Sequence, residues 1–257
     1  MSLIVTVCTG HGIVMASDSR LTLKRDDGMV PTNDTAFKTF ACPNGAGISI
    51  CGDAVHENEI ISAHINRMIE QRITEETPIT KLPDIIWDYF GHNDPVNGGT
   101  SFFVAGYERT KKGPEARIYW LSTEKDLTLR CLHEVHKHGA FWSGECEVLK
   151  RLLSPVLISS SVKSIANFTI RESGKVKTLP KAYIADAATA KLYRKPTLPY
   201  AFYTLQDAVD FAEFAIETTA STMRFYAVPQ TVGGPIDILI IEPTGCRWLR
   251  RKTLTAD

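Results

Sequence analysis

The sequence predicts an α+β fold, a four-layer α/β/β/α sandwich of two antiparallel sheets. Three observations lead to this prediction: two strand hairpins near the start of the chain, two amphipathic helices followed by a run of strands, and a long helix followed by a closing hairpin. The length of 257 residues is ample for one large core, and we expect a single domain, 1–257, with an insertion at about 154–203.

Strand and helix patterns follow one another along the chain. Short runs rich in β-branched residues predict strands over 3–8, 12–16, 38–42, 47–51, 101–107, 116–122, 127–135, 236–242 and 246–249. Apolar side chains at helical spacing predict helices over 54–73, 82–90, 144–153 and 204–226, and Thr204 with Asp207 forms a capping pair for the last of them. Residues 21–36 are polar and rich in turn residues, so we expect an extended loop there.

The predicted insertion has a different character. Residues 154–199 are polar, with three consecutive serines and four prolines, and the periodic patterns of the flanking segments are lost. Three interpretations stay open: an added hairpin, a helix around 185–192, or a surface arm that contacts a neighbouring subunit.

Composition and charge exclude several classes of function. The balance of 29 basic and 29 acidic residues offers no electrostatic attraction for nucleic acid or an anionic membrane. No secretory signal is evident, and no apolar run reaches the ~18 residues that a bilayer-spanning helix needs. The six cysteines lack the CxxC spacing of zinc and redox sites. We therefore expect a soluble cytoplasmic protein with no cofactor and neither nucleic-acid nor membrane partners.

A strand that begins at residue 3 holds the start of the chain in place, which draws attention to Ser2. Methionine aminopeptidases remove Met1 when the next side chain is small, and serine is small. The mature chain would then begin with a hydroxyl and a free α-amine on one residue. Because such an amine has an ordinary pKa of about 8, it can accept the hydroxyl proton and turn Ser2 into a nucleophile.

Five segments along the chain carry recognisable motifs: Ala16-Ser17-Asp18-Ser19-Arg20, Phe37-Lys38-Thr39-Phe40, Gly52-Asp53-Ala54, Phe141-Trp142-Ser143-Gly144 and Val232-Gly233-Gly234-Pro235-Ile236-Asp237. They resemble, in the same order, motifs of proteasome β-type subunits and their bacterial homologues, members of the N-terminal nucleophile (Ntn) hydrolases. The third resembles the turn that opens the family's first long helix. The resemblance covers the chain apart from the insertion and implies the Ntn hydrolase fold.

The resemblance also assigns roles to residues. Counting back from Asp18 and Arg20 at the family's spacing reaches Ser2, which becomes the nucleophile. Lys38 corresponds to the catalytic lysine, whose ammonium would pair with Asp18 and lower the pKa of the terminal amine. The alternatives are that Lys38 is a solvated strand lysine and that Asp18 and Arg20 form a structural ion pair. Ser143 either hydrogen-bonds the amine or caps the helix that follows it.

Two further features of the resemblance leave questions open. The amide that would bind the oxyanion falls at Ser49 when Gly52-Asp53-Ala54 is the anchor, and at Gly52 when residues are counted from Lys38. The family carries an Asp and a Ser around the Gly-Gly turn to orient the amine, whereas this chain has Pro229 and Val232.

A metal site is a competing hypothesis for three closely spaced histidines, His133, His136 and His138. On a strand, His136 and His138 share a face and His133 points to the other, so joint ligation would require a bend. We therefore expect no metal at these residues.

These observations predict an N-terminal serine peptidase or amidase of proteasome β-subunit type, acting through an acyl-enzyme on a peptide or amide substrate. The resemblance implies a homo-oligomer, either a ring or a spiral. The main alternative is a non-catalytic, proteasome-like assembly subunit that keeps Met1. A third is a transpeptidase that passes the acyl group to an amine.

Overall fold

The computed structural model describes residues 2–26, 28–90, 99–123, 128–131, 138–153, 167–172, 175–180 and 198–253. They belong to two compact units, Met1–Cys146 together with Pro199–Asp257, and Glu147–Leu198. The first unit contains the predicted site residues.

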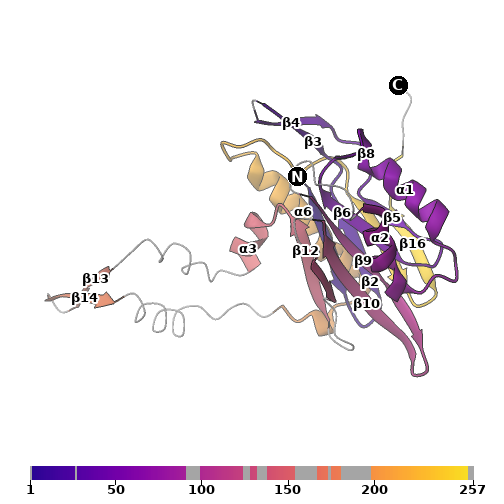
Figure 1. The fold of residues 1–257 in the computed structure, drawn as a ribbon. Coiled ribbons are helices and arrows are strands. Elements are labelled where there is room, and N and C mark those ends of the chain that lie inside the picture. The colour runs from indigo at the N-terminus through magenta and orange to yellow at the C-terminus, as the bar shows by residue number, and fades with distance from the viewer. Residues whose placement is uncertain are drawn as a thin grey trace. The chain divides into compact units, whose positions relative to one another are not determined.

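Two five-stranded antiparallel sheets form the centre of the first unit (Figure 1). The first sheet has, in spatial order, the strands β12 (Gly139–Gly144), β1 (Leu3–Cys8), β2 (Ile13–Ser17), β15 (Asp237–Glu242) and β16 (Gly245–Arg250). The second has β11 (Thr128–Cys131), β10 (Gly113–Ser122), β9 (Thr100–Thr110), β6 (Gly47–Gly52) and β5 (Thr39–Ala41). Each of these neighbouring strand pairs is antiparallel.

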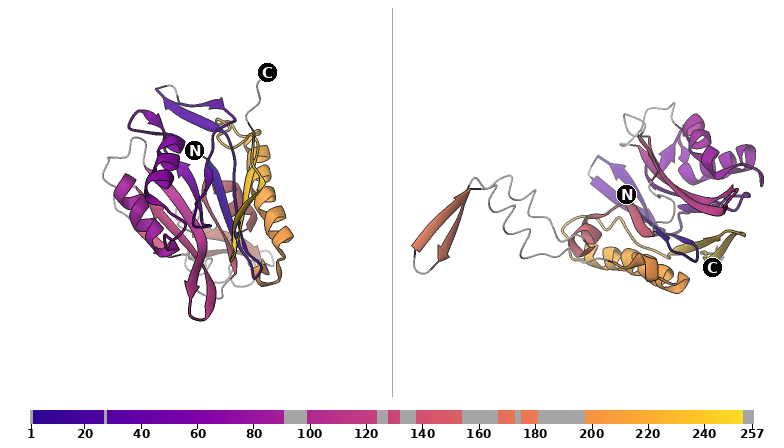
Figure 2. Two further views of the ribbon diagram at one scale, coloured as in Figure 1. Left: turned by 90° about the vertical axis from the view of Figure 1, so that its right-hand side faces the viewer. Right: turned by 90° about the horizontal axis from the view of Figure 1, so that it is seen from below.

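The core lies between the two sheets and beneath the helices. Ile4, Met15 and Leu239 of the first sheet share an apolar cluster with Phe103 and Ile118 of the second. The apolar sides of α1 (Ile61–Arg72) and α2 (Leu82–Phe90) cluster with β6 and β9 of the second sheet, and α6 (Leu205–Met223) packs on β1 and β2. Figure 2 shows the sheets between these two groups of helices. This mixed α/β arrangement is compatible with the predicted sandwich.

Helix α6 begins at the predicted capping pair. The Thr204 hydroxyl accepts a hydrogen bond from the Asp207 amide at 3.1 Å, and the Asp207 carboxylate accepts one from the Thr204 amide at 2.8 Å. This reciprocal capping box satisfies two backbone donors that a helix start leaves without partners. The predicted helix over 82–90 is also confirmed, and short 3₁₀ turns, η1 (Ile79–Lys81) and η2 (Tyr200–Phe202), precede α2 and α6.

Two predictions about local structure were wrong. The expected loop over 21–36 contains a hairpin of β3 (Leu21–Arg25) and β4 (Gly28–Asn33), with Gly28 at a φ of +128° beside the turn. The helix predicted from residue 54 begins at Ile61, because β7 (Val55–His56) and β8 (Glu59–Ile60) form a small hairpin first. Glu57 and Asn58 have φ values of 47° and 66°, which a right-handed helix does not contain.

The second unit contains α3 (Glu147–Leu153) and the hairpin of β13 (Asn167–Glu172) and β14 (Lys175–Pro180). This hairpin is one of the three interpretations of the insertion. The alternative helix around 185–192 lies outside the described residues. Among the helices that the structure describes, none is long and apolar enough to cross a membrane.

Candidate functional site

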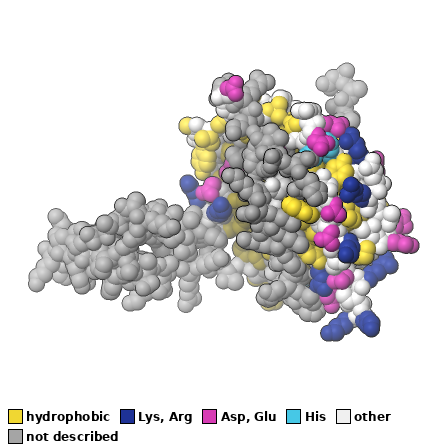
Figure 3. All heavy atoms as spheres, viewed as in Figure 1, with side chains coloured by type: hydrophobic (Ala, Val, Ile, Leu, Met, Phe, Trp, Pro, Cys, Tyr) yellow, Lys and Arg dark blue, Asp and Glu magenta, His cyan; other side chains and the backbone are white. Residues whose placement is uncertain are grey.

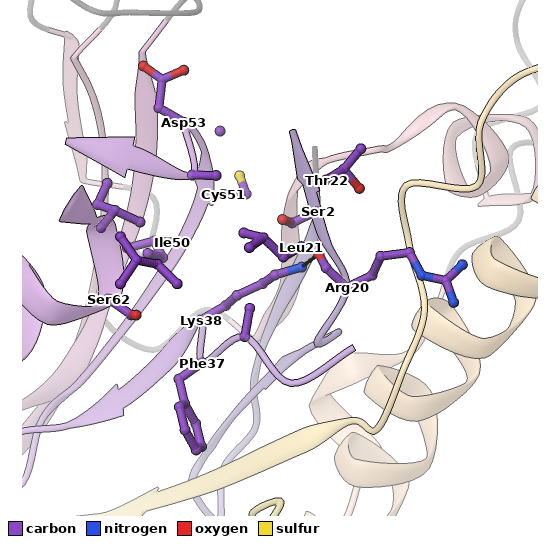
Figure 4. A pocket seen from close by; sticks show the side chains of 15 residues that line it. Ser2, Arg20, Leu21, Thr22, Phe37, Lys38, Ile50, Cys51, Asp53 and Ser62 are labelled. Carbon is purple, nitrogen blue, oxygen red and sulfur yellow. Dashed lines mark hydrogen bonds between the residues drawn. The ribbon is translucent and has the colours of Figure 1, made fainter. Parts of the chain in front are cut away.

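A pocket opens where β1 begins, beside the ends of β2 and β6 and the start of α1 (Figure 4). It encloses about 380 Å³, part of it open to solvent. The predicted residues among its lining are Ser2, Arg20, Lys38 and Gly52. The fold therefore brings together residues that the sequence separates by up to fifty positions.

Ser2 is held at the pocket by its own backbone. The residue is 7% exposed, and its carbonyl oxygen accepts a hydrogen bond of 2.9 Å from the Glu145 amide. A β carbon on Gly144 would lie 1.8 Å from that carbonyl oxygen, and Gly144 has a φ of +99°. Glycine is therefore required for this close approach. The Ser143-Gly144 motif is recognisable in the sequence. The contact between Gly144 and Ser2 is visible only in the structure.

The carboxylate of Asp18 is fully buried and accepts four hydrogen bonds. Its Oδ1 atom accepts from the Leu3 amide at 3.1 Å and from Lys38 Nζ at 2.8 Å. Its Oδ2 atom accepts from the amides of Arg20 and Gly233, each at 3.1 Å. Asp18 thus joins the start of β1, the end of β2 and the Gly-Gly turn to the lysine. A charge buried in this way is stable because each oxygen has donors.

The ammonium of Lys38 lies in the pocket with its stem packed. The side chain is 6% exposed, and Nζ also donates to the Arg20 carbonyl oxygen at 2.6 Å. Burial lowers the pKa of Lys38 below its ordinary value, while the charge and hydrogen bond of Asp18 act in the opposite direction. In Figure 4 the ammonium points toward the strand that Ser2 begins. The pocket lining therefore includes a poorly hydrated cation on Lys38 and a hydroxyl on Ser2.

The guanidinium of Arg20 points away from this cation, as Figure 4 shows. It forms a two-bond fork with the Asp34 carboxylate, both bonds at 2.7 Å, and a third bond of 3.3 Å to the Gln230 carbonyl oxygen. A β carbon on Gly233 would lie 2.7 Å from Arg20 Cζ, so the Gly-Gly turn gives the guanidinium room. The hydrogen bond with Asp34 raises the pKa of Arg20 and lowers that of Asp34. Arg20 thus contributes its backbone to the site and its side chain to the surrounding loops.

Besides Asp18, two further predicted residues, Ser49 and Ser143, are not part of the pocket lining. Ser49 is fully buried, and its hydroxyl lies 2.9 Å from that of Thr39, which donates to Ser17 Oγ at 2.9 Å. Ser143 hydrogen-bonds the thiol of Cys51, a pocket residue whose pKa burial raises to about 12. Such a thiol stays protonated at neutral pH, so it does not compete with a serine as nucleophile.

Of the two oxyanion candidates, Gly52 lines the pocket. Gly52 has a φ of +122°, and a β carbon there would lie 2.3 Å from the Gly99 carbonyl oxygen. A residue with a β carbon is therefore excluded at this position. Gly52 can contact a ligand only through its backbone.

The Gly-Gly turn reaches the site through its backbone. Where the resembled family has an acidic and a hydroxyl side chain, this chain has Pro229, which is exposed, and Val232, which is fully buried. Neither side chain carries an acidic or hydroxyl group.

Two of the three histidines in the metal hypothesis, His133 and His136, lie outside the described residues. His138 is described, and its Nδ1 atom is buried without a hydrogen bond there.

Comparison with known proteins supports the fold. The chain matches no family model and no curated protein. Its structure is similar to that of an Ntn-type, proteasome-like bacterial protein. That structure is the Gly-1 mutant of Anbu from Hyphomicrobium sp. strain MC1, with a TM-score of 0.51 and 15% sequence identity, covering 100% of this chain and 88% of the other. At this identity the likeness concerns the fold.

Proposed function

We propose that this chain is an N-terminal serine hydrolase of the Ntn type that cleaves peptide or amide bonds. The observation that carries the proposal is the pocket that Ser2 shares with the buried ammonium of Lys38. The similarity of the fold to Anbu supports the same conclusion. Removal of Met1 is part of the proposal, because the α-amine of Ser2 is the base.

The reaction proceeds in two steps. In the first, the α-amine takes the proton of the Ser2 hydroxyl, Oγ attacks the substrate carbonyl carbon, and the carbon–nitrogen bond breaks as the leaving amine receives the proton. In the second, water attacks the resulting ester and releases the acid and Ser2. The backbone at Gly52 is our candidate for stabilising the oxyanion in both steps.

Lys38 keeps the α-amine in its neutral, proton-accepting form. A cation close to an amine disfavours protonation of that amine and lowers its pKa. Asp18 holds the ammonium in place without exposing it to solvent, since the carboxylate is itself fixed by three backbone amides.

The proposal is tested by intact mass and by covalent labelling. We expect the soluble protein from its native host to lack Met1 and to react once with a sulfonyl fluoride, a general electrophile for activated serines. The variant S2A should lose labelling. S62A is the matched control, because Ser62 also lines the pocket and should leave labelling unchanged. A wild-type protein that lacks Met1 and does not react contradicts the proposal.

The second candidate is a non-catalytic assembly subunit. It is favoured by Pro229 and Val232, which leave the amine without the family's acidic and hydroxyl partners. Retention of Met1 would support this candidate and exclude the hydrolase. A transpeptidase is distinguished from a hydrolase by its products, since added amine would be incorporated into the cleaved substrate.

We also propose that the chain forms a homo-oligomer, either a ring or a spiral. Large apolar side chains are exposed at Phe202, Phe225 and Val228, by 85%, 86% and 56%. Figure 3 shows hydrophobic atoms at the surface over the loop that follows α6. Native mass spectrometry tests this proposal. F225D should lower the oligomeric state, and a monomeric wild-type protein contradicts it.

A further inference from the structure

Three side chains with metal-binding atoms gather at the β7–β8 hairpin, apart from the serine and lysine. His56 and Glu57 come from the hairpin and His64 from the first turn of α1, and one potential ligand atom of each lies within 4.8 Å of the others. The segment from Ala54 to Ile61 connects them directly to the pocket wall, because both of its end residues line the pocket.

One nitrogen of the His64 imidazole, Nε2, is buried without a hydrogen bond. The residue is 4% exposed, and its Nε2 atom is buried with no hydrogen-bond partner. Buried polar side-chain atoms nearly always have such a partner, so an exception calls for an explanation such as an ion. Its ring packs edge-on against His56, with centroids 4.8 Å apart and planes at 86°.

The spacing of these atoms suits a transition-metal ion. In a tetrahedral zinc site with bonds of about 2.1 Å, two ligand atoms lie about 3.4 Å apart. His64 Nε2 lies 3.4 Å from Glu59 Oε2, a fourth potential ligand that Arg67 fixes with a hydrogen bond of 3.0 Å. Glu57 is exposed, so its carboxylate can close the remaining separation by rotation of its side chain.

The donor set selects the class of ion. Two imidazoles and a carboxylate suit Zn²⁺ and its neighbours in the first transition row, whereas Mg²⁺ and Ca²⁺ prefer oxygen ligands throughout.

We propose that His56, Glu57 and His64 bind a divalent transition-metal ion of the Zn²⁺ class, with Glu59 as the fourth ligand. The ion would tie the β7–β8 hairpin to α1 and so fix one wall of the pocket. This site is independent of the proposed hydrolase, because it lies on other side chains and its test requires no catalysis.

The test measures Zn²⁺ binding to the untagged full chain carrying S2A, after treatment with a chelator, by competition with a chromophoric chelator. We expect one Zn²⁺ per chain in the parent and affinity lower by more than tenfold in H56A and in H64A. H11A removes an exposed histidine elsewhere and should bind as the parent does. Bound Co²⁺ should give the visible absorption of a site with nitrogen ligands.

Glu57 offers a sharper variant, because its φ of 47° is one that Asn adopts more readily than Glu. E57N therefore keeps the hairpin and removes the carboxylate. We expect E57N to remain folded by circular dichroism and to bind Zn²⁺ at least tenfold more weakly. The proposal is overturned if the parent binds no Zn²⁺, or if E57N and H56A bind it as tightly as H11A does.

Discussion

Two buried lysine–aspartate pairs lie at the same end of β2 and β15, and they differ in what surrounds them. Asp18 follows β2 and pairs with Lys38, while Asp237 begins β15, opposite Ser17, and pairs with Lys252. Lysine side chains in the two pairs are 6% and 5% exposed, and both aspartates are fully buried. Burial lowers the pKa of both lysines. By charge and burial alone the two pairs are nearly indistinguishable.

Their hydrogen-bond partners separate them. Asp18 accepts bonds from four residues, and its lysine lines the pocket with Ser2. Asp237 accepts bonds from Lys252 alone among the described hydrogen bonds, through the ammonium and through the backbone amide at 2.8 Å. The Lys252 ammonium lies 4.4 Å from the centroid of the Phe37 ring and is not part of the pocket lining. A buried charge is a stronger candidate for function when it also lines a pocket, and this criterion selects Lys38 over Lys252.

The largest expected effect distinguishes the two lysines directly. K38M and K252M each leave a buried carboxylate without its cation, which costs about 3–5 kcal/mol of unfolding free energy in either case. In K38M, sulfonyl fluoride labelling of Ser2 should also slow by about 10²–10⁴-fold, the range of a lost acid–base contribution. Urea unfolding and labelling rates provide the two measurements. If K252M slowed the labelling of Ser2 as much as K38M does, the proposed difference between the two lysines would be wrong.

The next effect concerns the glycine that lets β12 approach Ser2. G144A places a methyl group against the Ser2 carbonyl oxygen and should lower the unfolding free energy by about 2–4 kcal/mol, with loss of labelling. G245A is the matched control, because Gly245 also has a positive φ, 141°, but no atom within 4 Å of an added β carbon. G245A should cost about 1–2 kcal/mol and leave labelling unchanged. Comparable destabilisation by the two variants would contradict the close contact.

The smallest effect concerns the exposed pair of Arg20 and Asp34. The guanidinium holds the pKa of Asp34 below its ordinary value, so the pair stabilises the fold above the unfolded pKa of about 3.9 and loses this contribution as the pH falls through the folded pKa. Asp34 is 42% exposed, so D34N should cost less than about 1 kcal/mol at pH 7. Unfolding measured from pH 7 to pH 2 should show the difference from wild type disappearing in acid. A constant difference would exclude ionisation as its source.

The elements predicted correctly from the sequence have local signals. The first hairpin has two β-branched runs, and Thr204 with Asp207 forms a capping box within four residues. The β7–β8 hairpin was missed because its two-residue strands are too short for a periodic pattern and its turn is Glu57-Asn58 rather than a glycine pair. β12 was missed because its pairing with β1 depends on residues more than a hundred positions away.

The candidate site likewise contains some features with a local sequence signal and others without one. The segment Phe37-Lys38-Thr39-Phe40 could be matched to a family motif, and the structure pairs the Lys38 side chain with that of Asp18. The donation from the Gly233 amide to Asp18 joins residues 215 positions apart, and no local pattern encodes it. Spacing also left Ser49 and Gly52 as equal oxyanion candidates, because the choice depends on which part of β6 reaches the pocket.

The attachment of Ser2 has a practical consequence for the production of this protein. Its carbonyl oxygen is fixed by Glu145 and enclosed by Gly144, and the residue itself borders the pocket. An affinity tag fused ahead of Ser2 would begin beside the pocket and would convert the α-amine into an amide. Because that amine is the proposed base, assays of the proposed activity require material with an authentic amino terminus.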